Sequence, residues 1–321
     1  MRHWALEALI VGCMTWASVA CAQQAVPSPA QVAQAEAQAQ AYRAQYGVSP
    51  QLLQFMSEIA RAKLATGQRR AAQAYAQQTE QLCRQELQRR AVDAEPRLPL
   101  ALGGAIEVRA QAMAENGNRS GALALLRGAL KEYGSTSLQA RLQKNLNLLT
   151  LEGKPAPPLV EQQYLGPKPP PLSALRGRPI LLFFWAHWCA DCKHEGPIIS
   201  RLESEYRSRG LVLLGPTQRY GYAAYGEPAP PQAELQYIDS VRRQYYGDLS
   251  NMPVPVSKIN FDRYGASTTP TLVLINRRGF VAMYHPGVLS YEQLRDEIEK
   301  VVAPSPAVQR EPSHRNTKTP R

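Results

Sequence analysis

Two cysteines with two residues between them, Cys189 and Cys192, lie where an apolar stretch gives way to a helical pattern. The stretch, residues 180–185, has the length and composition of a buried parallel strand. A thiol at the start of a helix faces unpaired backbone N–H groups that favour its thiolate, so we expect Cys189 to be the nucleophile. Cys192, one helical turn further along, can attack the mixed disulfide that Cys189 forms. This spacing predicts two-step thiol–disulfide exchange.

Three other uses of a cysteine pair fit this segment less well. A structural zinc site needs four ligands, usually two such pairs. Apart from scattered histidines, the chain after its first 22 residues offers only one further clear ligand, Cys83, so the second pair is missing. Haem attachment requires a histidine directly after the second cysteine, and that residue is Lys193. A purely structural disulfide would not need a Trp-Cys sequence at a strand-to-helix turn. The pair is therefore expected to be a redox site, with no metal and no cofactor.

Residues 185–197 read Trp-Ala-x-Trp-Cys-x-x-Cys-Lys-x-x-x-Pro, which resembles the active-site segment of the thioredoxin superfamily. Glu195, three residues after the second cysteine, narrows this resemblance to the TlpA/ResA-like periplasmic thiol–disulfide oxidoreductases. A second match, residues 264–275, resembles the cis-proline loop of that family and the central strand after it. The resemblance covers about 154–302 and implies an α/β thioredoxin-like domain, a central mixed sheet flanked by helices.

The resemblance also suggests roles for individual residues. Cys189 and Cys192 would form the redox disulfide. Glu195 would handle protons, because a partly buried carboxyl has a raised pKa and can exchange a proton with a thiol. The alternative for Glu195 is an ordinary exposed helical position. Phe183 stands where thioredoxins proper place a buried aspartate, which leaves Glu195 as the nearest replacement.

Substrate contacts are expected around a proline and a tryptophan. Pro270, as a cis-proline, would present the backbone of Thr269 to an extended substrate strand, although an ordinary trans turn is the alternative. Trp188, beside Cys189, is expected to form part of the wall of the site rather than to do chemistry. Asp191, between the cysteines, suits a first helical turn but opposes a thiolate.

The first 22 residues have the features of an export signal. Arg2 supplies the positive start, residues 5–20 are mostly apolar, and Ala20-Cys21-Ala22 is a small-residue cleavage site. An uncleaved anchor is disfavoured because the segment is short for a membrane span. Lipoprotein processing, with Cys21 acylated, is the second alternative. The protein is thus expected in the periplasm or outside the cell, either soluble or tethered through Cys21.

Residues 23–152 are rich in Ala and Gln, with apolar residues at helical spacing. Residues 62–67 followed by Ala72 resemble residues 112–117 followed by Ala122, in each case a glycine that ends one helix before a small residue in the next. This pattern favours a tetratricopeptide-like array of helical hairpins. The spacing of fifty residues and the missing aromatic positions leave an irregular helical bundle as the alternative.

A chain of 321 residues is long enough for two domains. We expect a signal peptide (1–22), a helical domain (23–152) and a Pro/Gly linker (153–158). A thioredoxin-like domain (159–303) and a disordered basic tail (304–321) are expected to follow. Within 23–152, the low-complexity start is expected to be a frayed helix or a linker. The linker predicts that residues 154–303 would fold on their own.

Within the thioredoxin-like domain, strands are expected at 211–214, 254–256, 271–275 and 280–284, with helices at 190–209, 232–246 and 290–302. A capping box, with Ser290 as the N-cap and Gln293 as its partner, is expected to start the last helix. Residues 215–231 form a Tyr-, Gly- and Pro-rich loop that is longer than this fold requires. We expect its part 219–231, with the aromatic residues Tyr220, Tyr222 and Tyr225, to influence partner choice. Cys83 is expected to be a small buried hydrophobe rather than a chemical group.

The formal net charge of +11 comes without a long Lys/Arg run, which makes nucleic acid a poor candidate partner. The resemblance implies reduction of disulfide-bearing protein substrates, as in cytochrome c maturation, with electrons from a membrane-bound thiol reductase. An oxidant or isomerase of folding exported proteins is the alternative among enzymes. A helical-repeat interaction scaffold with a vestigial thioredoxin domain is the alternative from another class, and the intact dithiol argues against it. A partner of the helical domain is also expected.

Overall fold

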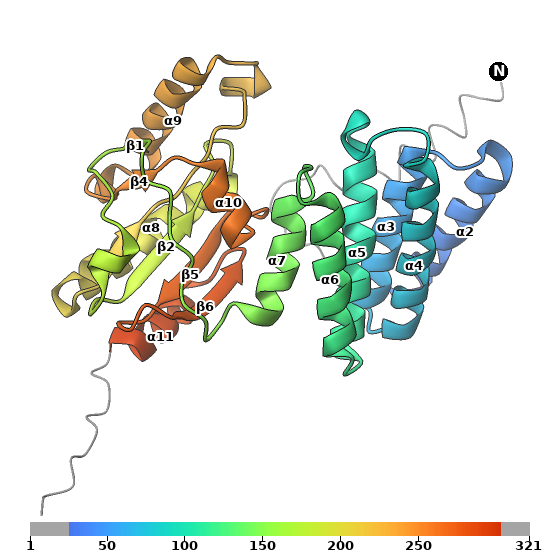
Figure 1. The fold of residues 1–321 in the computed structure, drawn as a ribbon, viewed down its shortest axis with the longest axis horizontal. Helices are drawn as coiled ribbons and strands as arrows, with labels where there is room; N and C mark the ends of the chain where they lie inside the picture. Colours follow the sequence, from blue (N-terminus) through green and yellow to red (C-terminus); the bar gives the residue numbers. More distant parts are fainter. Residues whose placement is uncertain (1–25, 303–321) are drawn as a thin grey trace, which may run out of the picture. The chain divides into compact units, whose positions relative to one another are not determined.

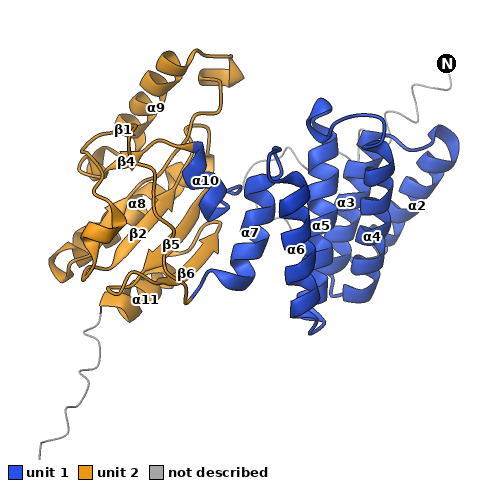
Figure 2. Cartoon of the chain, in the orientation of Figure 1, with its two compact units in different colours: residues 1–152, 258–268 blue, residues 153–257, 269–321 orange. Residues whose placement is uncertain are grey.

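The computed structural model describes residues 26–302, so the expected export signal, Cys21 and the basic tail lie outside the described residues. The described chain divides into two compact units, coloured separately in Figure 2. Unit 1 comprises residues up to 152 together with 258–268, and unit 2 comprises 153–257 together with residues from 269 onward.

The described residues of unit 1 form helices and no strand, as the composition predicts. Its helices are α2 (Pro29–Tyr46), α3 (Pro50–Ala65), α4 (Arg69–Glu86), α5 (Arg97–Glu115), α6 (Arg119–Tyr133), α7 (Gln139–Thr150) and the short α10 (Lys258–Tyr264). Figure 1 shows α3 to α6 lying side by side. Of the low-complexity start, residues 23–45, the part from Pro29 onward is a regular helix rather than a linker. Ser28 and Gln31 cap this helix with reciprocal hydrogen bonds of 2.8 and 3.3 Å.

The two similar segments form the same type of turn between paired helices. Gly67 and Gly117 end α3 and α5 with φ of +78° and +84°, a conformation that residues with a Cβ rarely adopt. The residue after each glycine donates its N–H five residues back, at 2.9 Å in the first turn and 2.8 Å in the second. Ala72 and Ala122, five residues after each glycine, are completely buried. Helical hairpins are therefore present, while a tetratricopeptide assignment stays a prediction.

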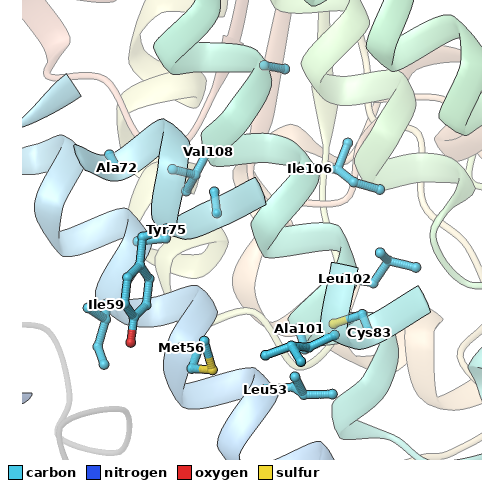
Figure 3. Close-up of a cluster of buried hydrophobic side chains, with 14 of the residues drawn as sticks. Leu53, Met56, Ile59, Ala72, Tyr75, Cys83, Ala101, Leu102, Ile106 and Val108 are labelled. Atoms are coloured by element: carbon cyan, nitrogen blue, oxygen red, sulfur yellow. The ribbon is translucent and has the colours of Figure 1, made fainter. Parts of the chain in front are cut away.

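The core of unit 1 is a continuous apolar cluster that includes Cys83 (Figure 3). The Cys83 side chain is completely buried, which agrees with its expected role as a small hydrophobe. Burial, together with the nearby Glu80 carboxylate, raises the pKa of the Cys83 thiol to about 12. This thiol therefore stays protonated and inert at neutral pH.

Helix α10 was not predicted from the sequence, and it belongs to unit 1 although it follows β4 in the chain. It packs against α7, where Asn147 Nδ2 donates to the Arg263 carbonyl at 3.4 Å. A Cβ at Gly265 would lie 2.2 Å from the Lys144 backbone nitrogen, so only glycine allows this close approach.

Unit 2 contains a four-stranded mixed sheet with strand order β3–β2–β5–β6, which confirms the expected α/β fold class. The strands are β2 (Ile180–Phe184), β3 (Val212–Leu214), β5 (Thr271–Ile275) and β6 (Val281–Pro286). Strand β2 runs parallel to β3 and antiparallel to β5, and every residue of β2 and β5 is buried. A separate antiparallel pair joins β1 (Tyr164–Leu165) to β4 (Val254–Pro255).

Helices α8 (Ala190–Tyr206), α9 (Pro231–Tyr245) and α11 (Tyr291–Val302) contribute to the core of unit 2. Alternate residues of β2 and β5, including Phe183 and Leu272, share one apolar cluster with side chains from all three helices. The predicted capping box starts α11, since Ser290 N–H donates to Gln293 at 2.9 Å and Gln293 N–H returns to Ser290 Oγ at 3.3 Å. The sheet and α8 together fix the strand-to-helix turn that carries the cysteines.

Candidate active site

Cys189 is the N-cap residue of α8, immediately after the turn that follows β2. Its Sγ accepts a hydrogen bond from the Cys192 backbone N–H at 3.0 Å, and the two cysteines form a disulfide. Cys189 is 3% exposed and Cys192 is completely buried, so Cys189 is the cysteine on the solvent side. A thiolate at this N-cap would be stabilised by the N–H groups of the first helical turn.

The proline loop faces the cysteines because of the register between β2 and β5. Phe184 pairs with Thr271 in this antiparallel pair, so the residues after β2 and before β5 emerge at the same edge of the sheet. The Thr269–Pro270 peptide bond is cis, and the Thr269 carbonyl oxygen lies 3.4 Å from Cys189 Sγ. The structure thus brings Cys189 next to Thr269 and Pro270, although Thr269 is eighty residues after Cys189 in the sequence.

Glu195 lies on α8 one turn beyond Cys192 and is 2% exposed, so it is not an ordinary exposed helical glutamate. Its Oε1 accepts a hydrogen bond from the Leu289 backbone N–H at 3.3 Å. Burial raises the pKa of this carboxyl from 4.5 to about 7, the Leu289 N–H opposes that rise, and the nearby Asp191 adds to it. A group with this pKa can both accept and release a proton near neutral pH.

The two tryptophans beside the cysteines have different environments. Trp185 is completely buried, and its Nε1–H donates to the Gly215 carbonyl at 2.9 Å. Trp188 is 49% exposed, and its ring meets the ring of Tyr220 edge to face with centroids 5.5 Å apart. Trp185 therefore supports the turn from inside, while Trp188 and Tyr220 form a surface beside Cys189.

The sequence reasoning missed His187 and Glu234, which lie 3.6 Å apart from Nε2 to Oε1 and are each 1% exposed. Glu234 is in the first turn of α9, and His187 is two residues before Cys189. Burial lowers the pKa of His187, while the Glu234 carboxylate opposes that change and Lys193 reinforces it. The one signal in the sequence was a histidine in an otherwise apolar part of the motif. Nothing near His187 in the chain indicated a link to Glu234, which is 47 positions away.

Among residues 26–302, no group of three or more His, Cys, Asp or Glu side chains is arranged to hold a metal ion. No helix in that range is both long enough and apolar enough to cross a membrane.

Comparison with known proteins relates about half of the chain to redox proteins. The thiol-disulfide oxidoreductase ResA of Halalkalibacterium halodurans is 27% identical over 135 residues, which are 41% of this chain and 67% of that protein. The thiol:disulfide interchange protein DsbE of Xylella fastidiosa is 29% identical over 157 residues, 48% of this chain and 70% of that protein. No model of a protein family matches the chain.

Among solved structures, a thiol:disulfide interchange protein of the thioredoxin family from Chlorobium tepidum is 18% identical, with a TM-score of 0.36 over 46% of this chain and 96% of that one. The mixed sheet and the cysteine pair at the start of α8 lie in the C-terminal half of the chain. Over about half of its length, this chain is a ResA/DsbE/TlpA-like thiol–disulfide oxidoreductase that carries Cys189 and Cys192 as its Cys-x-x-Cys pair.

Proposed function

We propose that this protein is exported and reduces disulfides of periplasmic protein substrates, with electrons from a membrane-bound thiol reductase. The observation that carries this proposal is the placement of Cys189 at the start of α8, 3.4 Å from the Thr269 carbonyl, with the buried Cys192 one turn and the buried Glu195 about two turns further along the same helix. Cytochrome c maturation is one process that requires such a reductant. Export is proposed because residues 1–22 have the features of a signal peptide. Attachment to the membrane through an acylated Cys21 is the alternative to a soluble exported protein.

The exchange transfers two electrons from the dithiol to the substrate disulfide. The Cys189 thiolate attacks one substrate sulfur, and the other substrate sulfur leaves as a thiolate and takes up a proton. Glu195, as a carboxylate, accepts the proton of the Cys192 thiol. The Cys192 thiolate then attacks Cys189 Sγ, which forms the Cys189–Cys192 disulfide and releases the second substrate thiolate. Glu195 returns its proton to the departing sulfur or to water.

The surface around Cys189 is suited to a polypeptide rather than to a small molecule. The backbone of Thr269, beside the reactive sulfur, can hydrogen-bond to an extended substrate segment. Trp188, half exposed and packed on Tyr220, offers an aromatic contact directly before Cys189 in the chain. We also propose that the helical hairpins of unit 1 bind a protein partner through their paired helices.

The direction of the chemistry can be tested by the reduction potential. The carboxyls of Glu195 and Asp191 oppose a thiolate at the dithiol, and a less stable reduced form means a lower potential. We expect a value of roughly −250 mV or below, near thioredoxin rather than near the strong oxidants at about −120 mV. Equilibration in dithiothreitol buffers, followed by tryptophan fluorescence, measures it. A value above about −180 mV would support an oxidant or isomerase instead.

The tip of the long loop should affect protein substrates selectively. The Ala229 N–H donates to the Gly221 carbonyl at 3.0 Å, so residues 222–228 can be replaced by a short Gly-Ser turn without moving the base of the loop. This removes Tyr225, whose side chain is fully exposed and whose φ of +57° is unfavourable for tyrosine. It also removes Tyr222, whose ring meets that of His187. Loss of an aromatic contact worth about 1 kcal/mol should raise KM for reduction of insulin five- to tenfold, a range of about 1–1.4 kcal/mol. Equal losses on insulin and on a small disulfide would contradict this expectation.

A further inference from the structure

The carboxylate of Glu234 attaches the long loop to the body of unit 2. One carboxylate oxygen accepts the backbone N–H of Tyr220, and the other accepts that of Gly221 at 3.0 Å. A carboxylate that is 1% exposed and bonded to two consecutive backbone N–H groups is a strong, specific attachment. The loop is therefore held at Tyr220 and Gly221, the sixth and seventh residues after β3, and the Tyr220 ring contacts Trp188 beside Cys189.

His187 lies beneath this attachment and fills the space between the loop and α9. Its ring meets the rings of Tyr220, Tyr222 and Tyr237 edge to face, with centroids 5.6, 5.2 and 5.4 Å apart. Its Nε2 is 3.6 Å from Glu234 Oε1, which is longer than a hydrogen bond, and it has no other partner among the described residues. The main contribution of His187 is thus the aromatic packing surface that it provides for the loop tyrosines.

The position of Tyr220 depends on both residues. Glu234 holds its backbone N–H, His187 packs against its ring, and the same ring meets Trp188 beside Cys189. Beyond Tyr220 the loop closes on itself, with a bridge between Tyr222 and Pro228. The two hydrogen bonds to Glu234 and the ring contacts of Tyr220 named here do not involve the side chain of either cysteine.

We propose that Glu234 and His187 are positioning residues that hold Tyr220 against Trp188, and that this aromatic pair determines the preference of the dithiol for protein disulfides over small disulfides. The inference rests on the proposed function, because it names the surface through which the same site binds polypeptide. A small disulfide needs only access to Cys189 Sγ. A polypeptide also contacts the residues around it, so its KM depends on whether Tyr220 is fixed.

The main test is the full-length variant Glu234→Gln, compared with Glu227→Gln as a matched control. Glutamine keeps one acceptor oxygen but presents an NH₂ group to the second backbone N–H, whereas Glu227 is an exposed glutamate in the same loop. We expect KM for insulin to rise about tenfold in Glu234→Gln, equivalent to about 1.4 kcal/mol. Its kcat, and kcat/KM for 2-hydroxyethyl disulfide, should stay within about twofold of the unmodified protein. Glu227→Gln should behave like the unmodified protein on both substrates.

Two further substitutions separate positioning from folding. Tyr220→Ala leaves the Glu234 acceptors in place and removes the ring, so it should reproduce the higher KM for insulin. His187→Ala removes the aromatic packing and should raise the KM for insulin. His187→Phe preserves the packing and should keep the KM of the unmodified protein. Near-UV circular dichroism should show a change in the Trp188 environment in every variant with the higher KM, since those variants alter the ring packed against it.

The outcomes distinguish this inference from the proposed function. If the unmodified protein does not reduce insulin but does exchange with the small disulfide, the proposed function fails. If the unmodified protein reduces insulin and Glu234→Gln and Tyr220→Ala leave its KM unchanged, the positioning role is wrong while the proposed function stands. A parallel loss on both substrates would also overturn the positioning role, because it would indicate damage to the dithiol itself.

Discussion

Replacing Cys192 by serine should stop the reaction halfway and leave the substrate joined to Cys189. Cys189 at the start of α8 can still attack a substrate disulfide, but the group that would release the mixed disulfide is gone. Turnover of insulin should fall to background, and a covalent adduct should appear on a non-reducing gel. Cys189→Ser should also abolish turnover, but without an adduct, because Cys192 is completely buried.

Cys83→Ala is the matched control for this experiment. The Cys83 thiol is completely buried, and its pKa is raised to about 12, so it cannot replace either active-site cysteine at neutral pH. Turnover should therefore be unchanged in Cys83→Ala. An adduct that maps to Cys83, or exchange activity that survives in Cys189→Ser, would show that the assignment of the nucleophile is wrong.

The second large effect is expected from Glu195→Gln, as a gain in stability that depends on pH. Burial raises the pKa of Glu195 from 4.5 in the unfolded chain to about 7 in the folded oxidised protein. The stabilising contribution of the protonated carboxyl is thus complete below about pH 4.5 and is lost as the pH rises through about 7. Since a tenfold difference in proton affinity is worth about 1.36 kcal/mol, the loss amounts to about 3 kcal/mol. Glutamine stays neutral and avoids it.

Urea unfolding of the oxidised protein at pH 4.5 and pH 9, followed by the fluorescence of Trp185 and Trp188, measures this difference. We expect Glu195→Gln to match the unmodified protein at the lower pH and to be about 3 kcal/mol more stable at the higher pH. Glu203→Gln, on the same helix and paired with Arg207 near the surface, is the control and should show no such gain. A constant difference at both pH values would mean that the Glu195 carboxyl does not titrate as described.

The elements that the sequence predicted are those with local signals. The strand before Cys189, the helix after it and the capping box at Ser290 all depend on residues close together in the chain. The turns at Gly67 and Gly117 were visible because a glycine with positive φ has a local physical cause. The motif of the site could be found in the same way, since the cysteines and Glu195 share two turns of one helix.

The features that could not be predicted depend on contacts between distant residues. The attachment of the long loop requires that Glu234, in the first turn of α9, meet backbone N–H groups at Tyr220 and Gly221. A buried glutamate looks the same as an exposed one in a polar helical sequence, so only the folded structure reveals this role. Likewise, the short helix α10 has little local propensity signal and is stabilised by packing against α7.

The assignment of residues 258–268 to unit 1 means that the covalent chain passes between the units three times, after residues 152, 257 and 268. Neither unit is therefore one continuous segment of the chain, and a single recombination junction could not exchange either unit for that of another protein. A fragment of residues 154–303 keeps α10 but lacks α7, against which Gly265 is placed too closely for any side chain. An exchange of the helical unit between related proteins would have to carry two separate gene segments, and the second would end directly before the Thr269–Pro270 bond beside Cys189.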